Sequence, residues 1–407
     1  MTGTRGGFAG LDACVHCGFC LQACPTFLAT GDESDSPRGR IELMRALERG
    51  DLEVTDTALA YHLDRCLGCR ACEPVCPSGV RYGHGLEAAR SRITTTRGLP
   101  VLARLALWAL TTSGVSNVVY WFARLLRATG IPRLLAGSGR FGFSMGMLAA
   151  TKPVKGVTST TLHRASPTST ALLFRGCVQQ GLFSHVHDAT IRTLAVNGHE
   201  VREVTGQGCC GALHAHAGLL DEARALARTN IAAFGDGDEP IVVNSAGCGA
   251  LMKEYGHLLG EAAGERFSRR VRDVTELLAP APVPGAPLDL HVAYDPPCHL
   301  LHAQGIAVPP LKLFAAIPLL ELVQVPGAAE CCGSAGLFTL LEPEMSRAVL
   351  APKIARLREA APQVVATGNP GCLMQLGAGL AAARIRAQVR HPVELLDDSY
   401  RAAGRYE

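Results

Sequence analysis

Sixteen cysteines are the side chains of this 407-residue sequence best suited to metal or redox chemistry, and half of them stand in two short runs. The runs Cys14–Pro25 and Cys66–Pro77 both read C-x2-C-x2-C-x3-C-P. This spacing is typical of a site for two [4Fe–4S] clusters, in which the fourth cysteine of each run binds the other cluster. The pattern predicts two ligand sets: Cys14, Cys17, Cys20 and Cys76 for the first cluster, and Cys24, Cys66, Cys69 and Cys72 for the second.

Disulfide bonds and structural zinc are the two other uses of such cysteines. Disulfides need an oxidising compartment, and residues 1–8 lack the apolar stretch of an export signal. Structural zinc is typically bound by closed sets built from paired C-x2-C elements, whereas each run here adds a third cysteine and a Cys-Pro pair. The sequence therefore favours reduced, metal-binding cysteines in the cytoplasm.

The other eight cysteines recur in two halves of the chain with the same order of motifs. Each half contains an apolar stretch ending in cysteine, a Cys-Cys-Gly triplet, a second apolar stretch ending in Gly-Cys, and a closing segment rich in Val and Leu. The closing segments are Val271–Leu278 and Val389–Leu396. The two sets are Cys177, Cys209, Cys210 and Cys248 in the first half, and Cys298, Cys331, Cys332 and Cys372 in the second.

Strands and helices must alternate in both halves to position these cysteines. Short apolar stretches such as 171–177 alternate with helical segments such as 221–228, which predicts α/β units with a parallel sheet. The cysteines follow the strand ends, where open α/β sheets bind ligands. The functional interpretation is a further cluster or metal site. The alternative is a duplicated fold in which the cysteines are buried as small apolar residues.

The segment between the two N-terminal runs contains helix signals. Apolar residues at helical spacing predict a helix over 37–47 that stops near Gly50, and Thr55-Asp56 predicts the start of a second helix over 58–63. We therefore expect a mostly helical cluster domain. Arg38 and Arg40 lie close to the runs, so they either tune the cluster potential or are solvated arginines at a helix start.

Residues 78–95 are predicted as an exit helix, and residues 99–150 as an apolar connector. Within it, Leu105–Ala123 is free of charge, but its polar centre argues against a membrane-spanning helix. We expect two short amphipathic helices with a turn at Ser113-Gly114, packed between domains or docked on a partner or membrane. The G-x-G-x-x-G stretch at Gly137–Gly142 lacks the preceding strand of a dinucleotide site.

Composition and length complete the expected architecture. The chain is 48% hydrophobic and 18% charged with a formal net charge of +3, and it has no basic block suited to nucleic acid. We predict a multidomain protein, with a mostly helical two-[4Fe–4S] ferredoxin-type domain followed by two α/β cysteine-rich (CCG) repeats. The expected domains are residues 1–95 (clusters), 96–169 (helical connector and linker), 170–285 (first repeat) and 286–407 (second repeat).

Several short segments of the sequence, in addition to the cysteine motifs, resemble those of a known protein family. The sequence resembles the iron–sulfur subunit of bacterial glycolate oxidase, a glycolate dehydrogenase, in four segments: Cys14–Cys20, Gly31–Arg40, His62–Cys66 and Cys76–Tyr82. The Cys-Cys-Gly halves are similar to the cysteine-rich repeats of that subunit. Related repeats occur in the cysteine-rich subunits of anaerobic glycerol-3-phosphate dehydrogenase and of heterodisulfide reductase. The resemblance covers nearly the whole chain.

The resemblance implies an electron-transfer role. A flavin-containing partner would oxidise glycolate to glyoxylate, and this chain would pass the electrons towards a membrane acceptor such as quinone. The chain would then be cytoplasmic and peripheral at the inner face of the cell membrane. We expect no catalytic residue here, because the isolated histidines are typical of polar core or surface positions: His214, His216, His299 and His302.

Two other functions remain open. The chain is either the equivalent subunit of a lactate or glycerol-3-phosphate dehydrogenase, or a heterodisulfide-reductase-like enzyme whose repeats do the chemistry. Heterodisulfide reductase repeats bind an unusual iron–sulfur cluster through one cysteine, a Cys-Cys pair and a closing C-x2-C. Here the last cysteine is missing from both halves, because Leu251 and Gln375 stand in its place.

Overall fold

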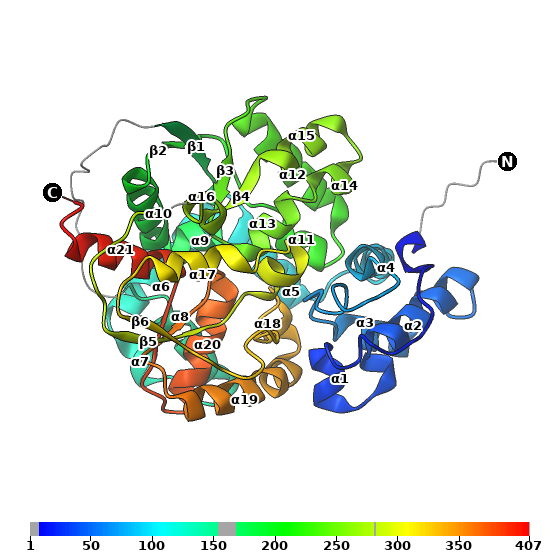
Figure 1. Cartoon of the computed structure of the whole chain (residues 1–407). Helices are drawn as coiled ribbons and strands as arrows, with labels where there is room; N and C mark the ends of the chain where they lie inside the picture. Colours follow the sequence, from blue (N-terminus) through cyan, green and yellow to red (C-terminus); the bar gives the residue numbers. More distant parts are fainter. Residues whose placement is uncertain (1–7, 154–167, 281, 407) are drawn as a thin grey trace.

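The computed structural model describes residues 8–153, 168–280 and 282–406. A helical N-terminal domain lies beside two α/β repeats, and a row of helices connects them (Figure 1). The order of these parts and the two parallel sheets match the predicted fold class. Residues 1–7, which carried most of the export argument, and residues 154–167 of the predicted connector and linker lie outside the described residues.

The cluster domain consists of short helices that local capping signals begin and end. Ser36 accepts a hydrogen bond from the Gly39 backbone at the start of α2, and Gly50 ends that helix in the left-handed conformation. Asp56 caps α3 in the same way as Ser36 caps α2. Both predicted helices are therefore confirmed. The helices are α1 (Pro25–Thr30), α2 (Pro37–Arg49), α3 (Thr57–Asp64) and α4 (Tyr82–Arg97), with 3-10 turns at Ala9–Leu11 and Glu33–Asp35.

The exit helix α4 begins four residues later than position 78, where the sequence analysis placed it. Gly79 has a φ of 66°, which is incompatible with a right-handed helix. The Arg81 amide donates to the Gly10 carbonyl at 3.2 Å, so residues 78–81 are held as a loop against the N-terminal segment. This loop directly follows Cys76 and holds it near the first run.

Four helices form the connector, and the predicted turn at Ser113-Gly114 separates the first two. They are α5 (Val101–Thr111), α6 (Val115–Ala128), α7 (Ile131–Leu134) and α8 (Arg140–Ala150). α6 packs on α9 of the first repeat, where Gly181 leaves room for the Tyr120 ring. α8 packs on α20 of the second repeat. Among the residues described, no helix has the length and apolar character needed to cross a membrane.

The two repeats share one topology. Their four-stranded sheets are parallel throughout, in the orders β2-β1-β3-β4 and β6-β5-β7-β8. The first contains β1 (Ser169–Leu173), α9 (Val178–Leu182), α10 (Ser184–Val196), β2 (His199–Glu203), α11 (Ala212–His216), α12 (Leu220–Phe234), β3 (Ile241–Val243), α13 (Ala246–Met252), α14 (Tyr255–Leu259), α15 (Ala262–Arg270), β4 (Val271–Asp273) and α16 (Val274–Leu278). The second contains β5 (Leu290–Tyr294), a π-helical turn (His299–Ala303), α17 (Val308–Ala315), β6 (Leu320–Val323), α18 (Phe338–Leu341), α19 (Pro343–Ala360), β7 (Val364–Ala366), α20 (Pro370–Ala382), β8 (Gln388–Arg390) and α21 (Pro392–Ala402).

The repeats pack on each other through one continuous apolar core. α10 of the first lies against α21 of the second, and Arg192 donates twice to the Asp397 carboxylate at 2.8 Å. The closing segments that matched in the sequence both form a strand followed by a helix with a capping box. The duplication predicted from the motifs is therefore a duplication of structure.

Candidate metal centres

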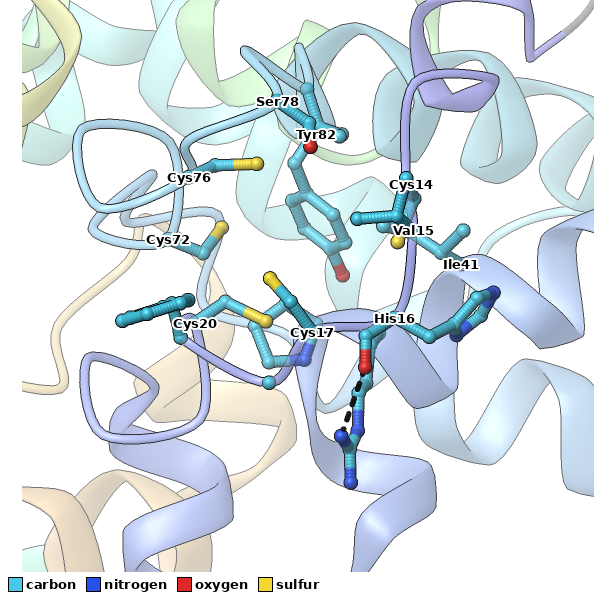
Figure 2. A pocket seen from close by; sticks show the side chains of 15 residues that line it. Cys14, Val15, His16, Cys17, Cys20, Ile41, Cys72, Cys76, Ser78 and Tyr82 are labelled. Carbon is cyan, nitrogen blue, oxygen red and sulfur yellow. Dashed lines mark hydrogen bonds between the residues drawn. The ribbon is translucent and has the colours of Figure 1, made fainter.

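The first predicted ligand set lines one pocket. Its four cysteines surround an empty volume of about 420 Å³, to which Cys72 of the second set also contributes. Figure 2 shows the sulfur atoms of Cys17, Cys20 and Cys76 around this space, with the Tyr82 phenol beside them. Cys17 is exposed, so this pocket lies close to the protein surface.

The second predicted set lines a deeper pocket of about 300 Å³. Cys24, Cys66, Cys69 and Cys72 are all buried. The Cys66 sulfur accepts hydrogen bonds from the Tyr82 hydroxyl at 3.5 Å and the Gly68 amide at 3.4 Å. Hydrogen bonds to sulfur are a known control of cluster potential. The structure thus places the four cysteines of each predicted set around one pocket. Which cysteines bind which cluster stays a prediction.

The two runs adopt the same backbone shape. The third and fifth residues of each run have positive φ: His16 (56°) and Gly18 (87°) in the first, Gly68 (61°) and Arg70 (60°) in the second. For the non-glycine residues His16 and Arg70 this conformation costs roughly 1–2 kcal/mol each. Such conformations persist where the surroundings impose them, typically at functional sites. The repeated shape turns successive cysteines of a run towards one space.

A buried ionic network lies beside the second pocket and joins two of the segments on which the family resemblance rests. Arg40 and Asp35 are fully buried and lie 3.1 Å apart. Arg40 also donates to the His62 carbonyl at 2.7 Å and to the Thr26 hydroxyl at 2.9 Å. Asp35 in addition contacts Arg65 at 2.9 Å and His62 at 3.0 Å. Gly31–Arg40 and His62–Cys66 therefore meet around one carboxylate.

This network corrects one alternative of the sequence analysis. Arg40 is not a solvated arginine, because it lies inside the domain against Cys66 and Cys24. Arg38 is partly exposed, and it binds Glu33 at 2.6 Å and the His16 carbonyl at 3.2 Å beside the first pocket. Gly39 allows this close packing, since a Cβ there would lie 2.0 Å from the Glu33 carbonyl oxygen.

The four cysteines of the first repeat gather behind the ends of β1 and β3. The sulfur atoms of Cys177 and Cys209 are 3.4 Å apart, and Cys210 and Cys248 belong to the same packed cluster. His214 contacts Cys209, and its Nδ1 atom is buried without a hydrogen-bond partner in the described structure. From the sequence His214 was interpreted as an isolated histidine, although its position four residues after Cys210 is a local signal for this contact.

The second repeat gathers its cysteines in the same way. The sulfur atoms of Cys332 and Cys372 are 3.0 Å apart, and Cys331 is in contact with Cys298. The buried Lys353 ammonium lies near the Cys332 sulfur and pairs with the Asp295 carboxylate. Burial raises the pKa of Asp295 to about 6, and Lys353 offsets part of that effect. No sequence signal identified this pair.

Cys69 of the cluster domain meets Cys331 of the second repeat. The two side chains belong to one buried apolar cluster with Leu67, Phe338 and Met345. The Arg70–Glu254 ion pair, at 2.5 Å, connects the same run to the first repeat. His299 accepts or donates a hydrogen bond at the Gly68 carbonyl, 3.1 Å away. The second cluster pocket and the second cysteine-rich site are therefore direct neighbours.

Three of the four sets contain a thiol with a lowered pKa, and the thiolate is the form that binds metal. A hydrogen bond with Cys331 lowers the pKa of Cys69. Hydrogen bonds with Cys177 and Cys210 lower the pKa of Cys209. Contact with Cys331, and then with Cys372, lowers the pKa of Cys332.

The positions of the missing closing cysteines supply no ligand. Leu251 is part of the apolar core of the first repeat. The Gln375 side chain is buried and bonded to the hydroxyls of Ser346 at 2.8 Å and Thr339 at 3.2 Å. His216 and His299 are half-buried neighbours with ring centroids 5.2 Å apart, while His302 bonds the Ala329 carbonyl at 3.2 Å. Each repeat therefore offers four cysteines.

Four cysteine thiolates can bind either an iron–sulfur cluster or a zinc ion. In a tetrahedral zinc site with Zn–S bonds of about 2.3 Å, the sulfurs lie about 3.8 Å apart. Among the residues described, no three cysteine sulfurs lie within 4.8 Å of one another. The one group that close in the described part of the chain is Asp32, Asp35 and His62, which the buried network already occupies. Metal analysis of the purified chain distinguishes a cluster from a zinc ion at these cysteines.

We expect the repeats to bind at least one further cluster or metal. The N-terminal sets account for about eight iron atoms per chain, and a further four-iron site raises this to about twelve or more. Anaerobic counting of iron, acid-labile sulfide and zinc in the full chain measures this. The double variant Cys210→Ser/Cys332→Ser should return the iron count to about eight. If the unmodified chain itself contains about eight iron atoms and no zinc, the repeat cysteines are structural.

Fold and sites define an iron–sulfur protein with a two-cluster domain and duplicated cysteine-rich repeats. Comparison with protein families agrees: residues 10–80 match the 4Fe-4S dicluster domain, and residues 171–253 and 292–377 match the cysteine-rich domain. The predicted pair of [4Fe–4S] clusters is therefore confirmed, and the repeats with their neighbouring cysteines fit additional iron–sulfur binding.

Full-length relatives narrow this class to one family. The chain is 34% identical to the probable glycolate oxidase iron-sulfur subunit of Bacillus subtilis and 34% identical to the glycolate oxidase iron-sulfur subunit of Escherichia coli, with 96% of this chain and 94% of each relative covered. It belongs to the family of glycolate oxidase iron-sulfur subunits. A fumarate reductase (CoM/CoB) subunit of Methanothermobacter marburgensis is 26% identical, over 96% of this chain and 72% of the relative.

A solved structure supports the fold alone. A hypothetical protein from Helicobacter pylori superposes with a TM-score of 0.52 at 9% sequence identity, covering 94% of this chain and 71% of the other.

Proposed function

We propose that this chain is the electron-transfer subunit of a glycolate oxidase complex. In this complex a flavin-containing partner oxidises glycolate to glyoxylate, and the electrons pass towards a membrane acceptor such as quinone. The observation that carries the proposal is the pair of crossed cysteine sets in adjoining pockets, within a chain similar over its full length to glycolate oxidase iron-sulfur subunits. When bound, [4Fe–4S] clusters supply one-electron transfer.

The chain's own residues set the conditions for that role. The first pocket is open to a partner, because Val15 and Phe19 beside it are 70% and 68% exposed. The second pocket is deep, and it places the Arg40 cation and the Tyr82 hydroxyl against its sulfurs. Both features favour contact with a partner at one pocket and protection from solvent at the other.

We place the complex in the cytoplasm, peripheral at the inner face of the cell membrane.

The purified chain alone should not oxidise glycolate. The substrate chemistry is assigned to the flavin partner, so dye reduction is expected only after the native complex is assembled. The measurement is anaerobic dye reduction with a panel of 2-hydroxy acids, for the co-purified complex and for the single chain. Glycolate-dependent dye reduction by the single chain would refute the assignment of glycolate oxidation to the flavin partner.

The same panel of 2-hydroxy acids tests the second candidate function, in which the chain is a subunit of a related dehydrogenase. Lactate utilization protein A of Geobacillus kaustophilus is 29% identical over 55% of this chain and 97% of that protein. A complex that turns over lactate or glycerol 3-phosphate in preference to glycolate assigns the chain to a related dehydrogenase. Reduction of a disulfide substrate by the chain itself assigns it instead to the heterodisulfide-reductase-like class.

A further inference from the structure

The connector exposes apolar side chains on its outward face. α5 and α6 bury Ala103, Leu107 and Tyr120 against the protein, yet their opposite faces are also apolar. We call this surface the connector face. It comprises Leu105, Trp108, Trp121, Phe122, Leu125 and Leu134, all more than half exposed. On α6 the exposed residues recur every three to four positions, so they form one stripe along the helix.

The charged side chains around the connector face are all positive. The sequence contains no Asp or Glu between Glu87 and Asp188. Arg104 on α5, Arg124 on α6 and Arg133 on α7 are exposed, and no carboxylate of the described residues pairs with them. The whole chain has a net charge of only +3, so the connector concentrates positive charge beside apolar surface.

Both tryptophans of the chain lie on this face. The sequence has two Trp residues, and Trp108 and Trp121 are 55% and 54% exposed. Tryptophan gathers at the level of lipid head groups, and helices with an apolar face flanked by arginine lie in the interface of anionic bilayers. A protein partner would also accept tryptophan and arginine. The complete lack of acidic residues over three successive helices favours the lipid surface.

We propose that the connector face docks this chain on an anionic lipid bilayer. Trp108 and Trp121 enter the head-group region, and the arginines contact lipid phosphates, each contributing on the order of 1 kcal/mol. The helices lie along the membrane plane. The proposal deepens the proposed function, since a membrane acceptor would lie in the same bilayer that binds the connector face.

Vesicle binding tests the proposal without any substrate. The full chain with its clusters is sedimented with sucrose-loaded vesicles of phosphatidylcholine, with and without phosphatidylglycerol. We expect at least about tenfold tighter binding to the anionic vesicles, weakened by salt. Because the chain's two tryptophans both lie on the connector face, brominated lipids should quench the protein's tryptophan emission.

Matched variants locate the surface. Leu105→Glu/Phe122→Glu should abolish vesicle binding, and Arg104→Glu/Arg124→Glu should remove the preference for anionic lipid. Val308→Glu, at a 57% exposed apolar position on α17, is the control and should bind normally. Iron content and circular dichroism verify that each variant is folded.

Two results would overturn the proposal: no binding of the full chain to anionic vesicles, or equal loss of binding in the control and the connector variants. Protection of Trp108 and Trp121 from aqueous quenchers by the partner subunits, without vesicle binding, would identify a protein interface instead. Vesicle binding requires no turnover of glycolate, so failure of vesicle binding and failure of the proposed function are distinguishable.

Discussion

Cys20→Ser should lower the iron content by about four atoms per chain and destabilise the whole cluster domain. Each cluster joins the two runs, so loss of one cluster releases the loop that follows Cys76 and loosens the wall shared with the second pocket. Iron analysis and low-temperature EPR of the reduced protein measure this. Ala13→Ser, at an exposed position next to Cys14, is the control and should keep its full iron content.

The crossed ligand sets give a sharper form of this prediction. Cys76→Ser should remove the same EPR signal as Cys20→Ser, although Cys76 belongs to the other run. Cys24→Ser should instead affect the signal that Cys66→Ser affects. If Cys76→Ser groups with Cys66→Ser, or if Cys20→Ser retains all its iron and a native spectrum, the ligand assignment is wrong.

Arg40→Met should destabilise the cluster domain by about 3–5 kcal/mol, the usual cost of breaking a buried ion pair from one side. Arg40 is fully buried, and its loss leaves the Thr26 hydroxyl, the His62 carbonyl and one side of Asp35 without their donor. The measurement is the denaturant midpoint of the intact chain under anaerobic conditions, followed by cluster absorbance and circular dichroism.

Arg38→Met is the matched control, two residues earlier on the same helix. Its ion pair with Glu33 is substantially exposed, so the change should cost no more than about 1 kcal/mol. Equal stability of the two variants would show that the Arg40–Asp35 network does not hold the domain together.

The sequence predicted those features that have a local signature. Gly50 marked the end of one helix and Asp56 the start of the next, and the cysteine spacing predicted which thiols share a pocket. The repeated order of motifs predicted two sheets of equal topology. Each of these signals lies within a few residues of the feature it specifies, or repeats in register along the chain.

Contacts between distant segments left no such signature. The burial of Arg40 depends on residues 22 positions away, and the Lys353–Asp295 pair joins positions 58 apart. The meeting of Cys69 with Cys331 depends on how the cluster domain packs against the second repeat. An arginine or lysine in a helix is normally exposed, so only the folded arrangement identifies these residues as buried charges.

The central claim is that this chain receives electrons from a partner that oxidises glycolate. Anaerobic freeze-quench EPR tests it most directly, with glycolate added to the purified complex and to the chain alone. We predict signals of reduced [4Fe–4S] clusters in the complex and none in the chain alone, whereas dithionite should produce them in both. If the complex forms glyoxylate while the clusters of this chain stay oxidised with no acceptor present, the claim is contradicted.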